Sequence, residues 1–400
     1  MQVKHSVSQD GIGVETIVDA ALDIIVRQGL SELTLRPLAL KIGMSVSVIS
    51  ARMGSKDQLI DRVIEEAAAR DARFFARWLD LAAAVPTGPR GRATLSDLAF
   101  RDWLDTGRSQ ALFLIELVHD RALQATPSPL LDAWLERAGA FWSTLLFGSP
   151  ALGDLALGYI LDEAGFALGA GGNPAYTLLR LHCLHRFADG LFPGPVEDDA
   201  ANAIPRLIAA LESRDQPTSD LDDPKRRRIA DSAAQVIVSQ GIDMVTHRSV
   251  ALAAGVPAST VVYHFGARGA LVVAGLNAVI LRFHAYRDRA RAANIAPNDD
   301  SSARDLIKAT SMIALASVRE PTLVPHALDM RRRRGENIRA VDLESLGIVD
   351  PPGFDRATAQ VISIALFGMQ MIAMARKLPE RDYYHRAFAA LSAWRTTLAD

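Results

Sequence analysis

The chain has 400 residues, 49% of them hydrophobic and 22% charged, a length typical of about two to four domains and a composition that excludes a disordered chain. Its single cysteine, Cys183, excludes an internal disulfide and zinc motifs built on cysteine pairs. The net charge of −2 excludes a uniformly basic nucleic-acid binder and leaves local basic patches open. Because the N-terminal residues lack the apolar run of a secretory signal, we expect a cytoplasmic protein.

An internal repeat dominates the sequence. Residues 14–59 align without a gap with residues 226–271 at a constant offset of 212, with fifteen identities. A repeat unit of about 200 residues is too long for a solenoid, so two duplicated halves are expected, residues 1–212 and 225–400. Between them, residues 213–224 read SRDQPTSDLDDP, and this composition predicts a linker.

Each copy of the repeat predicts the same three helices. Apolar residues at helical spacing form a first helix that ends at a glycine, and a threonine then caps a short helix that ends at a second glycine. After a tight turn, a further short helix is expected over 46–53 in the first copy and 258–265 in the second. The residues that mark these helix ends and starts in the first and second copies are Gly29 and Gly241, Thr34 and Thr246, and Gly43 and Gly255. This order is that of a helix-turn-helix, although an ordinary helical hairpin shares it.

The last short helix of the second copy carries the most specific motif. Residues 255–265 read GVPASTVVYHF, and a basic residue, Arg268, follows. The segment resembles the signature of the TetR family of bacterial transcriptional regulators, G-V-x-x-x-T-hydrophobic-Tyr-x-His-Phe. The family tyrosine falls on Val262, with Tyr263 beside it. The first copy departs further, because its corresponding tyrosine, histidine and phenylalanine positions hold Ser50, Arg52 and Met53.

The resemblance implies an all-α protein of two fused TetR-like halves. Each half would have an N-terminal helix-turn-helix domain and a C-terminal helical domain for ligand binding and dimerisation. The expected divisions are residues 1–60, 61–212, the linker 213–224, 225–271 and 272–400. The implied function is a sequence-specific DNA-binding transcriptional regulator, an effector-responsive repressor that is not an enzyme and has no cofactor or metal. Its partners would be a double-stranded DNA operator and a small apolar effector, with no membrane.

The resemblance also implies DNA contacts, position by position. At the start of the motif's first helix, an arginine can chelate O6 and N7 of guanine in the major groove. Short side chains at the start of the second helix would face bases, and other residues would hold phosphates. In the first copy the expected set is Thr34, Arg36, Val46, Ser47, Val48, Arg52 and Lys56. In the second copy it is Thr246, Arg248, Ala258, Ser259, Thr260, Tyr263, His264 and Arg268, with Arg226, Arg227 and Arg228 as a basic arm. The alternative interpretation is that these are ordinary surface residues and that the rings of Tyr263 and His264 pack on a neighbouring helix.

Charge separates the two copies. Residues 224–270 hold six basic and two acidic side chains, a formal +4, whereas residues 12–60 hold five of each. Since each neutralised phosphate adds to affinity, the second copy is expected to dominate DNA binding. Because the base-facing positions differ between the copies, an asymmetric site with two unlike half-sites is expected.

Two features are expected in the regions between and after the repeats. Aromatic residues in the first half are either plain core or the lining of an effector cavity: Trp103, Phe113, Trp134, Phe141 and Trp142. Residues 159–168 and 361–375 are candidates for helices that join the halves into an intramolecular pseudo-dimer, while a further homodimer stays open. The nineteen uncharged residues 357–375 approach the length of a membrane span, but their polar side chains favour a buried core helix.

The remaining motifs are weak. The run Arg331–Arg334 is interpreted as a solvated face, with anion or DNA binding as the alternative. His182, Cys183 and His185 make an incomplete zinc site and are better explained as a helix face. Two other functions stay open: a ligand-binding or scaffold protein on the TetR fold with weak or lost DNA binding, and a helical enzyme with a site in the first half.

Overall fold

The computed structural model describes residues 13–85, 87–124, 126–190, 198–212, 223–292, 301–336, 338 and 354–396. Within these ranges all regular elements are helices, which confirms the predicted all-α class. Residues 213–222 of the predicted linker lie outside them. The α-helices are α1 Val14–Gln28, α2 Leu35–Ile42, α3 Val46–Met53, α4 Lys56–Ala84, α5 Pro89–Asp105, α6 Arg108–Leu123, α7 Pro129–Phe147, α8 Gly153–Ala170, α9 Pro174–Asp189, α10 Asp198–Ala210, α11 Pro224–Gln240, α12 His247–Ala254, α13 Ala258–Phe265, α14 Arg268–Ala292, α15 Ser301–Arg319, α16 Val324–Arg332, α18 Arg356–Ala375 and α19 Glu380–Thr396. Short 3-10 helices are η1 Leu30–Glu32, η2 Pro150–Leu152, η4 Ile242–Met244 and η5 Pro321–Leu323.

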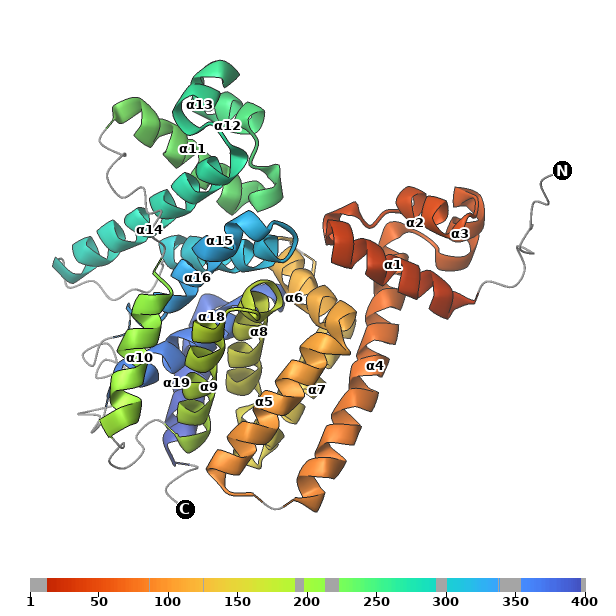
Figure 1. The fold of residues 1–400 in the computed structure, drawn as a ribbon. Helices are drawn as coiled ribbons and strands as arrows, with labels where there is room; N and C mark the ends of the chain where they lie inside the picture. The colour runs from red at the N-terminus through yellow and green to blue at the C-terminus, as the bar shows by residue number, and fades with distance from the viewer. Residues whose placement is uncertain are drawn as a thin grey trace.

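Two three-helix units carry the repeated sequence. We call α1–α3 the first head and α11–α13 the second head. The bounds of α2 and α3 recur in α12 and α13 at the offset of 212. Both turns between the short helices rest on a glycine in the left-handed region, Gly43 at φ 68° and Gly255 at φ 64°. Figure 1 shows the two heads as separate units on the same side of a larger helical body.

The threonine caps differ between the heads. In the second head, the side chain of Thr246 accepts a hydrogen bond from the backbone N–H of Ser249, as the sequence predicts. In the first head, Thr34 occupies the cap position without such a bond. The reason is local, because the residue three positions on is Pro37, which has no N–H to donate. Thr34 therefore stands at the predicted N-cap position of α2, but its side chain accepts no cap hydrogen bond.

The halves meet where α8 crosses α18. A Cβ on Gly368 of α18 would lie 1.9 Å from the carbonyl oxygen of Gly158 on α8, so the two backbones touch at this crossing. Helix α18 contains the long uncharged stretch and is long and apolar enough to cross a membrane, but 83% of that stretch is buried inside the protein. The segments that the sequence proposed as joining helices are thus in direct contact with each other.

Buried ion pairs reinforce this contact. Arg331, which is 0% exposed, donates to Glu163 of α8 at 2.8 Å, and Arg334 donates to Asp162 at 2.7 Å. The interpretation of Arg331–Arg334 as a solvated face is therefore wrong. The run lies at the end of α16 against α8, and the carboxylates that neutralise Arg331 and Arg334 come from 168 and 172 residues earlier in the chain. No local pattern could have indicated these partners.

The aromatic residues of the first half form its core. The indole N–H groups of Trp103 and Trp134 donate to the two carboxylate oxygens of Asp71 at 3.1 and 3.0 Å. Burial raises the pKa of Asp71 to about 7, against the effect of these two hydrogen bonds. Since Asp71 lies on α4, it ties that helix to α5 and α7. Phe141 stacks on Phe75 with ring centroids 4.2 Å apart, which completes an aromatic core around α4.

Candidate nucleic-acid interface and regulatory cavity

The outer face of the second head exposes the residues that the sequence assigned to base contact. Helix α13 buries Val261 and Phe265, one turn apart, against the rest of the head. Tyr263, which lies between them, points outward and is 85% exposed. Of the assigned set, Thr246, Arg248, Ala258, Ser259 and Tyr263 are exposed, while Thr260 and His264 are half-buried. The exposed face of α13 is that of a single helix, and the major groove of DNA is wide enough to admit one helix.

The basic arm forms the first turn of α11. Asp223 caps this helix by accepting from the backbone N–H of Lys225 at 2.9 Å, which fixes where the basic run begins. Lys225, Arg227 and Arg228 are exposed. Arg226 differs from them, because its guanidinium lies over the ring of Phe265 at 4.9 Å. Arg227 and Arg228 also line an open groove between α11 and α12.

Arg268 requires a correction. The sequence assigned it to a phosphate, but in the structure its side chain turns inward. It donates to the carbonyl oxygens of Val245 and Ile242, each at 2.9 Å, and forms an ion pair with Glu320. The guanidinium thus bonds to carbonyl groups in and just after η4. Arg268 therefore fastens the second head to the body, and three of its five N–H donors are engaged there.

The first head presents a less basic face. Arg36, Val46, Ser47 and Lys56 are exposed, and Thr34, Val48 and Arg52 are half-buried. Two further cations of this head are neutralised within it, since Asp23 forms ion pairs with Arg27 and Lys41. The hydrogen bond from Lys41, and then that from Arg27, holds the pKa of Asp23 below its usual value. The charge difference between the heads therefore persists in the folded protein.

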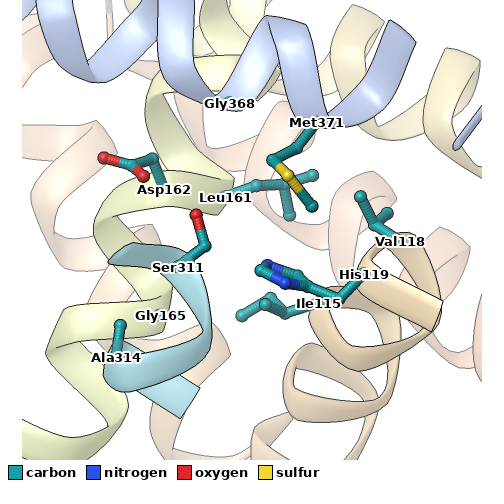
Figure 2. Close-up of a pocket in the computed structure, with 10 residues that line it drawn as sticks. All are labelled: Ile115, Val118, His119, Leu161, Asp162, Gly165, Ser311, Ala314, Gly368 and Met371. Atoms are coloured by element: carbon teal, nitrogen blue, oxygen red, sulfur yellow. The ribbon is translucent and has the colours of Figure 1, made fainter. Parts of the chain in front are cut away.

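A small cavity lies where the two halves meet, in the body beneath the heads. It is walled by α6 and α8 from the first half and by α15 and α18 from the second, and its volume is about 20 Å³. Figure 2 shows the ring of His119 pointing into the space between Ser311 and Met371, whereas the carboxylate of Asp162 points away from it. The Nδ1 atom of His119 is buried and has no hydrogen-bond partner.

The chemistry of this cavity is that of a neutral, mostly apolar site. Burial lowers the pKa of His119 to about 4, so its ring is uncharged at neutral pH. A volume of about 20 Å³ holds roughly one water molecule. The aromatic residues named from the sequence are buried in the core, the first of the two interpretations, and none of them lines this cavity. His119 and Ser311 carried no sequence signal, since neither belongs to a motif.

Cys183 also lies in the contact between the halves. It is fully buried on α9, its thiol lies 3.8 Å from Oε1 of Gln360 on α18, and burial raises its pKa to about 11. The thiol is therefore protonated and shielded at neutral pH.

Residues 229–274 match the sequence profile of the bacterial regulatory proteins of the tetR family. The match begins within α11 and runs through α12 and α13 into α14, so that it covers the second head. A TetR-type N-terminal domain at this place supports a DNA-binding transcription regulator of that family. No curated protein matches the chain.

Proposed function

We propose that this protein is an effector-responsive transcriptional repressor whose two heads bind one DNA operator from a single chain. The observation that carries the proposal is the second head, where an exposed reading helix lies inside the TetR-type domain at residues 229–274 and an exposed basic arm immediately precedes it. Phosphate contacts by the arm would fix the register, and Arg248 with α13 would read bases.

Several features support a tandem pseudo-dimer. The helix bounds of the two heads recur at one offset, and α8 of the first half packs on α18 of the second with backbones in contact. A pseudo-dimer of this kind would place two heads where one DNA duplex can reach both. We accordingly propose helix-turn-helix domains over residues 1–60 and 225–271, and regulatory domains over 61–212 and 272–400.

The first expected result is a single asymmetric operator. Selection of bound sequences from a random duplex library by the purified chain is expected to enrich one site with two unlike halves, because the reading helices differ at most exposed positions. Footprinting the winning duplex checks that both halves are covered. Enrichment of palindromic sites alone would contradict the expectation that the two heads read different sequences. No enrichment at low salt would favour a ligand-binding protein without DNA recognition.

We place the effector in the cavity between the halves. An uncharged ligand with one hydroxyl group can bond to the neutral ring of His119, while the apolar walls hold the remainder. Because the cavity holds about one water molecule, entry of a ligand would separate α6 from α15. Helix α6 packs against α1 of the first head and α15 packs against α11 of the second, so their separation would change how the heads are held.

A small substitution tests this placement with phenol as the probe. A Cβ on Gly165 would lie 3.5 Å from Cβ of Ala314, an ordinary contact, so Gly165→Ala narrows the cavity without a clash. We expect Gly165→Ala to weaken phenol binding, measured by calorimetry, by about tenfold or more, because an extra methyl group takes the room of the ligand. Operator binding without phenol should not change.

The control is Gly172→Ala, whose added Cβ would meet nothing within 4 Å. Equal phenol affinity in Gly165→Ala and Gly172→Ala would rule out the cavity as the binding site.

A further inference from the structure

The first head is held on the body by a residue of the second half. Arg319, the last residue of α15, donates to the carbonyl oxygens of Ile25 and Val26 at the end of α1. It also forms an ion pair with Glu116 of α6, and Glu116 in turn accepts from the backbone N–H of Leu30 at 2.6 Å. The last turn of α1 and Leu30 after it are therefore held by residues from both halves.

The second head is held by the next residue of the same helix end. Glu320 forms an ion pair with Arg268, and Arg268 donates to the carbonyl oxygens of Ile242 and Val245 beside η4. Arg319 and Glu320 are adjacent in the chain, yet one binds the first head and the other binds the second. Figure 1 shows this end of α15 between the two heads.

Among the described residues, this arrangement is found at one helix end. The positions 212 residues before Arg319 and Glu320 are Gly107 and Arg108, and Arg108 donates instead to the carbonyl oxygen of Leu168. At this offset, Arg319 and Glu320 therefore have no matching residues in the first half. A single helix end contacts both heads.

We propose that Arg319 and Glu320 are positioning residues that fix the spacing between the two heads and so determine which half-site spacing the protein accepts. The proposal rests on the proposed function, because it presumes that both heads bind DNA. Two reading helices on a rigid frame accept half-sites at one separation along the duplex, since base edges rotate with the helical repeat. Heads on a loose frame would accept many separations, each less tightly.

The test variant is Arg319→Met combined with Glu116→Gln and Glu320→Gln. Replacing Glu116 together with Arg319 avoids an unpaired buried carboxylate, and glutamine can still accept from Leu30. The matched control is Arg386→Met, which removes an ion pair with Asp154 that also joins the two halves but contacts neither head.

The first readout is affinity for duplexes in which the spacer between the selected half-sites is lengthened or shortened. The wild type and Arg386→Met are expected to lose about tenfold or more when the spacer changes by about five base pairs, half a helical turn. In the triple variant this loss should fall below about threefold, while affinity for an isolated second half-site stays within about twofold. An unchanged spacing profile in the triple variant would overturn the proposal.

The second readout requires no DNA. Spin labels at Ser50→Cys on α3 and Ala253→Cys on α12, both exposed, report the distance between the heads, and the buried Cys183 is protected from labelling. The distance distribution should be narrow in the wild type and in Arg386→Met and broad in the triple variant. An equally narrow distribution in the triple variant would also overturn the proposal, whereas a broad one beside an absent DNA site would reject the proposed function alone.

Discussion

Neutralising Lys225, Arg227 and Arg228 together, by substitution to glutamine, is expected to weaken operator binding by about 100-fold and to reduce the salt slope by about 3. The three side chains are exposed on the first turn of α11, where they can neutralise phosphates and release counterions. Fluorescence anisotropy titrations of the selected duplex at several sodium chloride concentrations measure both quantities. Competition with random DNA should show little change in sequence preference, because phosphate contacts carry no sequence information.

Two comparisons sharpen this result. Substitution of Arg248 to alanine should relax sequence preference at one base position, because an arginine to guanine contact contributes about 1–3 kcal/mol of discrimination. The same change at Arg36 of the first head should cost less affinity.

Arg77→Gln, on α4 far from the arm, is the control for loss of a surface cation. A loss in Arg77→Gln equal to that of the triple variant would show that net charge, and not the arm, drives binding.

Replacing Arg331 by methionine is expected to lower the free energy of unfolding by about 3–5 kcal/mol, because it leaves the carboxylate of Glu163 buried without its partner. Glu163 is 1% exposed and accepts in addition from the hydroxyl of Tyr176 at 2.7 Å. Combining Arg331→Met with Glu163→Gln should recover a large part of the loss, since the buried charge is removed and the tyrosine keeps an acceptor. Urea unfolding followed by circular dichroism measures the difference.

The control is Arg333→Met in the same arginine run. Its guanidinium is 28% exposed and pairs with Asp329 on its own helix, so its loss should cost no more than about 1 kcal/mol. Similar losses for the two arginines would mean that the contact between the halves does not depend on the buried pair.

The sequence determined the heads almost residue by residue. Apolar spacing, the glycines at 43 and 255 and the threonine at 246 act within a few residues of chain, so the bounds of α2, α3, α12 and α13 followed from local signals. The motif over 255–265 likewise indicated a TetR-type domain in the second head, and residues 229–274 match that family's profile. The exception was Thr34, where Pro37 removed the donor that a cap requires.

Only the tertiary structure decided what the charged side chains do. Arg268, predicted to hold a phosphate, turns inward to Glu320, and Arg331, predicted to lie in solvent, is buried against Glu163. The neutral His119 and the grip of Arg319 on the first head likewise depend on helices from both halves. The position of a charged side chain depends on its ion-pair partner and on how far burial removes it from water. Both depend on residues far away in the chain, whereas caps and turns depend on near neighbours.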